Sequence, residues 1–168
     1  MKLLIPLFLT AFVWGCATPE PIRPTTLFDS AEAKHALRQG DNNIRGSAII
    51  RQQGGGTVTC AGSAVGLIPA TAYANDIFYQ MHGSLERGFL HVADFRDNES
   101  VDPEFWRHGR KKTCDAQGFF KFDNLADGTS FISTEIIWKP TQHLFSGGNL
   151  MRSVTLSGGD SVEIVLAP

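Results

Sequence analysis

The chain has 168 residues, of which 42 % are hydrophobic and 19 % are charged, and its formal net charge is −2. This length allows one compact domain with tails, and the small charged fraction excludes a highly charged disordered chain. The slightly acidic balance argues against a basic nucleic-acid-binding protein, so we expect no nucleic-acid partner.

The N-terminus carries the features of an export signal. The apolar run from Leu3 to Trp14 has 12 residues, which is too short for a membrane-spanning helix of about 20 residues but matches the apolar region of a signal peptide. The run leads into Val13-Trp14-Gly15-Cys16, which resembles the lipobox of bacterial lipoproteins. The resemblance implies cleavage after Gly15 and a lipid anchor on Cys16, which places the protein in the cell envelope. Ala17 after the cysteine, in place of Asp, favours the outer membrane. The alternative to a lipoprotein signal is an ordinary secretory signal that is cut after Ala17.

Export also bears on the other two cysteines, Cys60 and Cys114. In an oxidising compartment they can form a disulfide that closes a loop of about 55 residues. Two buried free thiols are the alternative. The spacing of the cysteines does not match a zinc motif.

Four segments follow from this pattern. Residues 1–15 form the lipoprotein signal peptide, and residues 16–28, which contain three prolines, form a lipidated Pro-rich tether. Residues 29–40 form a short helix, because Asp29 and Glu32 have capping-box spacing and Gly40 can end the helix. Residues 41–168 form the main domain.

The main domain has the pattern of a mainly β protein. Extended segments are predicted at residues 44–51, 57–60, 64–68, 88–95 and 130–138, with one helix over residues 71–82. Two hairpins are predicted, one joining 111–114 to 119–122 through Asp115–Gly118, and one joining 154–156 to 162–166 through Ser157–Asp160. Seven or eight short strands with one or two short helices indicate a β-sandwich.

The stretch from Thr113 to Gly128 resembles the carboxypeptidase regulatory-like domain, a transthyretin-like (prealbumin-like) sandwich. The motif consists of turn and core residues, namely Asp115, Gly118, Phe120, Phe122, Leu125 and Gly128. The resemblance covers residues 43–70 and 110–166. It implies a seven- to eight-stranded transthyretin-like sandwich and leaves residues 71–110 as an insert.

The sequence offers no catalytic set, and we predict neither a metal site nor a cofactor. The His residues are not spaced as metal ligands on one element, and the serine of Gly62-Ser63-Ala64 lacks the flanks of a nucleophile elbow. One cluster of aromatic and basic residues is a candidate binding patch: Phe105, Trp106, Arg107 and Arg110. Core packing and a solvated loop are the alternatives for these side chains.

We therefore expect a non-catalytic cell-envelope lipoprotein, anchored in the membrane by its lipid, whose sandwich is a binding or scaffolding module for an envelope protein or polysaccharide. Two alternatives remain open. One is a lipoprotein component of an envelope-spanning secretion or assembly machine, which rests on fold analogy alone. The other is a carbohydrate-binding or small hydrolytic module that uses the 71–110 insert.

Overall fold

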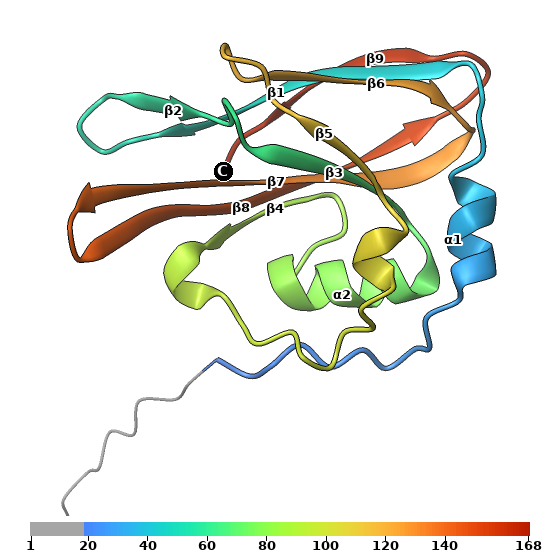
Figure 1. The fold of residues 1–168 in the computed structure, drawn as a ribbon, viewed down its shortest axis with the longest axis horizontal. Coiled ribbons are helices and arrows are strands. Elements are labelled where there is room, and N and C mark those ends of the chain that lie inside the picture. Colours follow the sequence, from blue (N-terminus) through green and yellow to red (C-terminus); the bar gives the residue numbers. More distant parts are fainter. Residues whose placement is uncertain (1–18) are drawn as a thin grey trace, which may run out of the picture.

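The computed structural model describes residues 19–168, so the predicted signal peptide and Cys16 lie outside the described residues. Two β-sheets pack face to face as a β-sandwich (Figure 1). The four-stranded sheet contains β2 (Thr57–Thr59), β1 (Asn42–Arg51), β6 (Phe119–Leu125) and β9 (Ser161–Leu166); the five-stranded sheet has the order β4 (Arg87–His91), β8 (Leu144–Leu156), β7 (Gly128–Thr141), β3 (Ala64–Pro69), β5 (Arg110–Thr113). The predicted mainly β sandwich is confirmed, with nine strands in the described residues.

The main core lies between the two sheets. Along β1, buried and partly exposed residues alternate, and Ile44 and Ala48 are fully buried. Phe120 and Phe122 project from β6 into the same core with their ring centroids 6.0 Å apart. Leu125, at the end of β6, is also buried there. The apolar residues of the predicted motif thus fill the space between the sheets.

Both predicted hairpins are wrong, although a turn forms at each position. The Gly118 N–H donates to the Asp115 carbonyl, and Gly118 has a φ of 86°. The strands on either side of this turn separate, because β5 pairs with β3 and β6 pairs with β1 in the other sheet. The second turn, Ser157–Asp160, likewise leads from β8 to β9, which pairs in parallel with β1. The long hairpin of the fold is formed by β7 and β8.

Two helices accompany the sheets. The predicted helix over 71–82 is confirmed as α2 (Ala72–His82), in which the Thr71 hydroxyl accepts from the Ala74 N–H and Gly83 ends the helix with a φ of 68°. The other helix, α1 (Ser30–Ala36), is shorter than predicted, and the Asp29 carboxylate accepts from two N–H groups of its first turn. No helix in residues 19–168 is long and apolar enough to cross a membrane.

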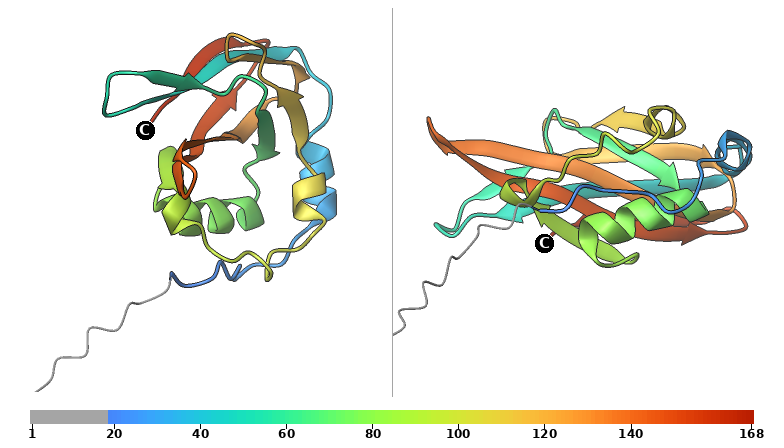
Figure 2. Two further views of the ribbon diagram at one scale, coloured as in Figure 1. Left: turned by 60° about the vertical axis from the view of Figure 1, so that its left-hand side comes forward. Right: turned by 90° about the horizontal axis from the view of Figure 1, so that it is seen from below.

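The 71–110 segment covers part of the outer face of the five-stranded sheet (Figure 2). It contains α2, β4 and two 3-10 turns, η1 (Val92–Asp94) and η2 (Phe105–Arg107). The predicted strand over 88–95 therefore ends at His91. Phe78 of α2 packs against Phe131 of β7 with ring centroids 4.4 Å apart. This contact belongs to a second core outside the sandwich.

Part of the predicted tether is packed against the domain, which corrects that prediction from Ile22 onward. Ile22 is only 3 % exposed, and its N–H donates to the Asp97 carbonyl over 2.8 Å. The Thr25 hydroxyl donates to Asp76 on α2 over 2.8 Å, and Phe28 packs on Tyr73. Although burial raises the pKa of Asp76, the hydrogen bonds from Thr25, Gln80 and Thr26 outweigh it and lower that pKa below its usual value. Two apolar side chains of the predicted tether explain the packing, since Ile22 and Phe28 bury surface in the second core.

The predicted disulfide between Cys60 and Cys114 is confirmed, with a Cα–Cα distance of 5.8 Å. Cys60 follows β2 and Cys114 follows β5, so the bond links the two sheets. Both cysteines are buried in the main core.

Candidate binding site

Part of the outer face of the five-stranded sheet is floored by small and polar side chains. Gly66 of β3 lies opposite Ser133 of β7, and Glu135 of β7 lies opposite Asn149 of β8. A Cβ atom placed on Gly66 would have no heavy atom closer than 3.8 Å. The floor therefore has open space above it.

Two adjoining cavities of about 420 and 360 Å³ lie over this floor, and both are lined by Trp106, Ser133, Glu135 and Asn149. We call the combined feature the Trp106 groove. One arm runs toward β5 and is also lined by Lys111 and Ile137, among others; the other arm runs beneath α2 and is also lined by Phe78, Met81, Phe95, Arg96 and Asn98, among others. Because four residues line both cavities, a ligand bound at Trp106 can extend into either arm.

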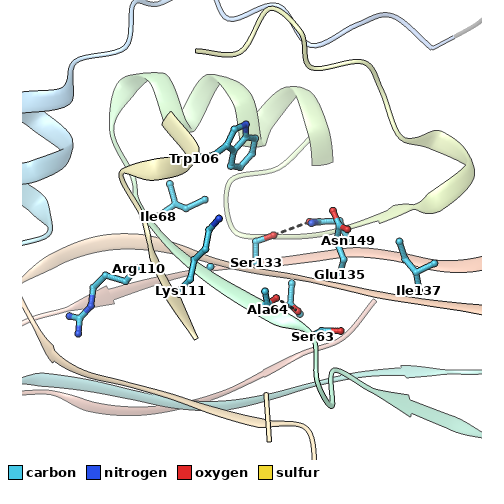
Figure 3. A pocket seen from close by; sticks show the side chains of 13 residues that line it. Ser63, Ala64, Ile68, Trp106, Arg110, Lys111, Ser133, Glu135, Ile137 and Asn149 are labelled. Atoms are coloured by element: carbon cyan, nitrogen blue, oxygen red, sulfur yellow. Dashed lines mark hydrogen bonds between the residues drawn. The ribbon is translucent and has the colours of Figure 1, made fainter. Parts of the chain in front are cut away.

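Trp106 is held over the groove by the second core. Its neighbour Phe105 is 2 % exposed, and the two ring centroids are 4.7 Å apart. Phe105 packs in turn on Tyr73 of α2 at 5.3 Å, and the Tyr73 hydroxyl accepts from the Asp102 N–H over 2.7 Å. The indole is half-buried and stands above the sheet (Figure 3). Its position is thus fixed before any ligand arrives.

The predicted binding patch is only partly assembled. Trp106 lines the groove, while Phe105 lies beneath it in the second core. Arg107 is exposed and forms an ion pair with Glu104 at 2.6 Å, outside the groove. Arg110 lines the groove but its guanidinium points away from Trp106 (Figure 3) and donates to the carbonyls of β6 residues 123 and 124.

The polar floor was not identified from the sequence. Ser133 and Asn149 are joined by a hydrogen bond of 3.0 Å from the serine hydroxyl to the amide oxygen, which fixes the orientation of the Asn149 amide. Glu135 stands beside them with an exposed side chain. Alternation along β7 predicts that residues 133 and 135 share a face, but the strand pairing that brings Asn149 and Gly66 beside them depends on the whole fold.

His82 lies behind the groove at the end of α2. Its ring stacks on Phe78 with centroids 6.2 Å apart, and neither buried ring nitrogen has a hydrogen-bond partner. Burial lowers the pKa of His82 to about 4, outweighing the opposite influence of the nearby Asn149 side chain. The ring is therefore uncharged at neutral pH and adds no positive charge behind the groove.

Within residues 19–168, no group of three or more His, Cys, Asp or Glu side chains is arranged to hold a metal ion. The groove instead combines an aromatic wall with hydroxyl, amide and carboxylate groups on a rigid sheet. Such an arrangement can bind an amphipathic ligand by stacking and hydrogen bonding.

The fold and groove are those of a β-sandwich with a ligand-sized depression on one sheet face. No protein-family model matches the chain, and no curated protein sequence matches it. The chain is similar to a crystal structure of a Pseudomonas aeruginosa protein that has been proposed to bind carbohydrate. The two share 26 % sequence identity with a TM-score of 0.70, over 84 % of this chain and 97 % of that one.

Proposed function

We propose that this protein is a non-catalytic carbohydrate-binding protein of the bacterial cell envelope. The observation that carries the proposal is the Trp106 groove. A pyranose ring presents a C–H face that can stack on an indole and hydroxyl groups that can pair with polar side chains. Trp106 supplies the aromatic surface, and Ser133, Asn149 and Glu135 supply the donors and acceptors. The similarity to a protein proposed to bind carbohydrate supports the same function.

The shape of the groove favours an oligosaccharide over a single sugar. Its two arms meet at Trp106, so one sugar unit can stack on the indole while its neighbours occupy the arms. We therefore expect affinity to rise with chain length up to the number of units that the groove accommodates.

The experiment is a glycan array followed by calorimetry on the full chain, with Trp106→Ala as the test variant. Loss of the stacking surface should lower affinity about tenfold, which corresponds to about 1.4 kcal/mol. Phe145→Ala is the matched control, because Phe145 is an exposed aromatic residue (51 % exposed) at the β7–β8 tip, outside the groove. Thermal unfolding of each variant separates loss of binding from loss of fold. Failure of the wild-type protein to bind any glycan would refute the proposal, as would equal binding by Trp106→Ala.

We also propose that the protein is exported and anchored by lipid on Cys16, in the outer membrane. The lipobox-like sequence Val13–Cys16 supports this. Because Ile22 is packed on the domain, the six peptide steps from Cys16 to Ile22 can span at most about 20 Å. An anchored domain would then lie close to the membrane, and so would the groove arm that Ile22 lines.

Labelling with radioactive palmitate tests the anchor. The wild-type chain should incorporate label and sediment with membranes, and Cys16→Ala should do neither. The double variant Cys60→Ala and Cys114→Ala is the control for loss of cysteine and should still incorporate label, because these two cysteines are joined in a disulfide and are not the proposed lipid attachment site. Label that persists in Cys16→Ala would disprove the anchor without affecting the carbohydrate proposal.

A further inference from the structure

We infer that the Trp106 groove selects acidic oligosaccharides, with Lys111 and Arg96 binding anionic groups on sugar units that lie on either side of Trp106. This inference rests on the proposed carbohydrate-binding function and names its ligand class. It is carried by the placement of unpaired positive charge at the two arms of the groove.

Lys111 supplies the charge of the first arm. Lys111 is on β5, opposite Gly66 of β3. It lines the groove and points toward Trp106 (Figure 3). Gly66 has no side chain, so the residue directly opposite on β3 does not crowd the lysine side chain. The next residue, Lys112, lines a different depression on the molecule together with Arg45 and Glu163. Two adjacent lysines of one strand thus serve different surfaces, as alternation along a strand requires.

Arg96 supplies the charge of the second arm. It is exposed, follows η1 in the 71–110 segment, and lines the groove together with Asn98. A guanidinium can bind a carboxylate or sulfate through two parallel hydrogen bonds. The neighbouring amide of Asn98 can donate to sugar hydroxyls.

Neither cation has a carboxylate partner among the residues that the structure describes. Among residues 19–168, the ion pairs within 4 Å are Arg107–Glu104 and Lys121–Asp123. The chain as a whole carries a net charge of −2, so positive charge in the groove is not a general property of this protein. An anionic ligand would complete both interactions.

Glu135 lies where the two arms meet, between the positions of the cations along the groove. Its carboxylate can accept hydrogen bonds from sugar hydroxyls but repels a second carboxylate. The charge pattern of the groove is therefore positive, negative, positive. Repulsion at the central unit opposes but does not cancel the two attractions, so a chain with an anionic group on every unit should still bind more tightly than its neutral counterpart.

The size of the expected effect follows from solvent exposure. An exposed ion pair contributes up to about fivefold in affinity. Salt weakens it strongly, because the screening length falls from about 10 Å at 0.1 M to about 3 Å at 1 M ionic strength. Preference for an acidic ligand should therefore be clear at low salt and nearly absent at high salt.

The test is calorimetry on the full chain with paired hexasaccharides. Each pair consists of a 1,4-linked uronate chain (galacturonate, glucuronate or mannuronate) and the same chain with its carboxyl groups reduced to alcohols. Wild-type protein should bind at least one acidic member about fivefold or more tightly than its neutral partner at low salt. Lys111→Ala and Arg96→Ala should each lower affinity for the acidic chain by up to about fivefold, and should lower affinity for its neutral partner by less. Lys112→Ala is the control and should behave as wild type.

The outcomes separate the inference from the function beneath it. If neutral chains bind as well as acidic ones and Trp106→Ala lowers affinity about tenfold, the acidic preference is wrong and the carbohydrate function stands. If Lys112→Ala weakens acidic binding as much as Lys111→Ala, the attraction is diffuse charge and the inference is also wrong. If neither member of any pair binds, the inference is wrong, while the proposed function is decided separately by the glycan array with Trp106→Ala.

Discussion

Breaking the Cys60–Cys114 disulfide should cost this protein about 4 kcal/mol of stability. The two cysteines are 54 residues apart in sequence, so the bond closes a loop of about 55 residues in the unfolded chain. In the chain-entropy model, a loop of this length changes the entropy by about −14 cal/mol/K, which is about 4 kcal/mol at 25 °C. The folded state should lose little beyond the bond, because both cysteines are enclosed by the main core.

Urea denaturation of oxidised and reduced wild-type protein measures this cost without changing the sequence. With a dependence of about 2 kcal/mol per molar urea, the midpoint should fall by about 2 M on reduction. The double variant Cys60→Ala and Cys114→Ala should fall by a similar amount and should not respond to reductant. A midpoint shift below about 0.5 M, at an unchanged dependence on urea, would refute the loop-entropy reasoning.

Three further predictions concern single side chains. Gly147→Ala should destabilise the fold by about 2–4 kcal/mol, because Gly147 has a φ of 95° and a Cβ would lie 1.9 Å from the Ile136 carbonyl oxygen. Gly54→Ala is the control and should change the urea midpoint little, because a Cβ there meets nothing within 4 Å. Asn42→Ala should lower the free energy of unfolding by about 3 kcal/mol in the same assay, and a loss below about 1 kcal/mol would contradict this. The buried Asn42 amide donates to the Leu125 carbonyl and the Asp127 carboxylate, and it accepts from the N–H groups of Gly159 and Asp160. The pKa of His82 is about 4, against 6.5 for an ordinary histidine, so the unfolded chain takes up a proton first as the pH falls. The contribution of His82 to stability should be constant above pH 6.5 and fall by up to about 3 kcal/mol between pH 6.5 and 4. Its ring should titrate near pH 4 by NMR, and a midpoint near 6.5 would show that the side chain is not buried as described.

The two wrongly predicted hairpins show which part of the fold is encoded locally. Asp115–Gly118 and Ser157–Asp160 contain the residues that turns require, and both turns form. A turn specifies that the chain reverses, but not whether the next strand pairs beside the last one or crosses to the facing sheet. That choice depends on long-range burial. Phe120 and Phe122 pack in a core that is closed on its far side by the other sheet.

The β7–β8 hairpin was missed for a related reason. Strand β8 includes Gly147 and Gly148, and residues of low strand propensity hide its pattern. In the fold these glycines are required by close packing, because a Cβ on Gly148 would lie 2.0 Å from the Leu90 carbonyl oxygen on β4. The feature that weakened the prediction is thus the feature that lets three strands approach one another.

The same distinction explains the binding site. Trp106 was predictable as a candidate because an indole beside basic residues is a local signal. The groove beneath it is made by strand register, which places Gly66 opposite Ser133 and Glu135 opposite Asn149. Lys111 is the instructive case: the sequence places it among four basic residues, and only its pairing with Gly66 separates it from Lys112 and directs it toward Trp106. Because one step along the strand reverses the face that a side chain occupies, a pair of adjacent lysines gives the binding hypothesis its own internal control.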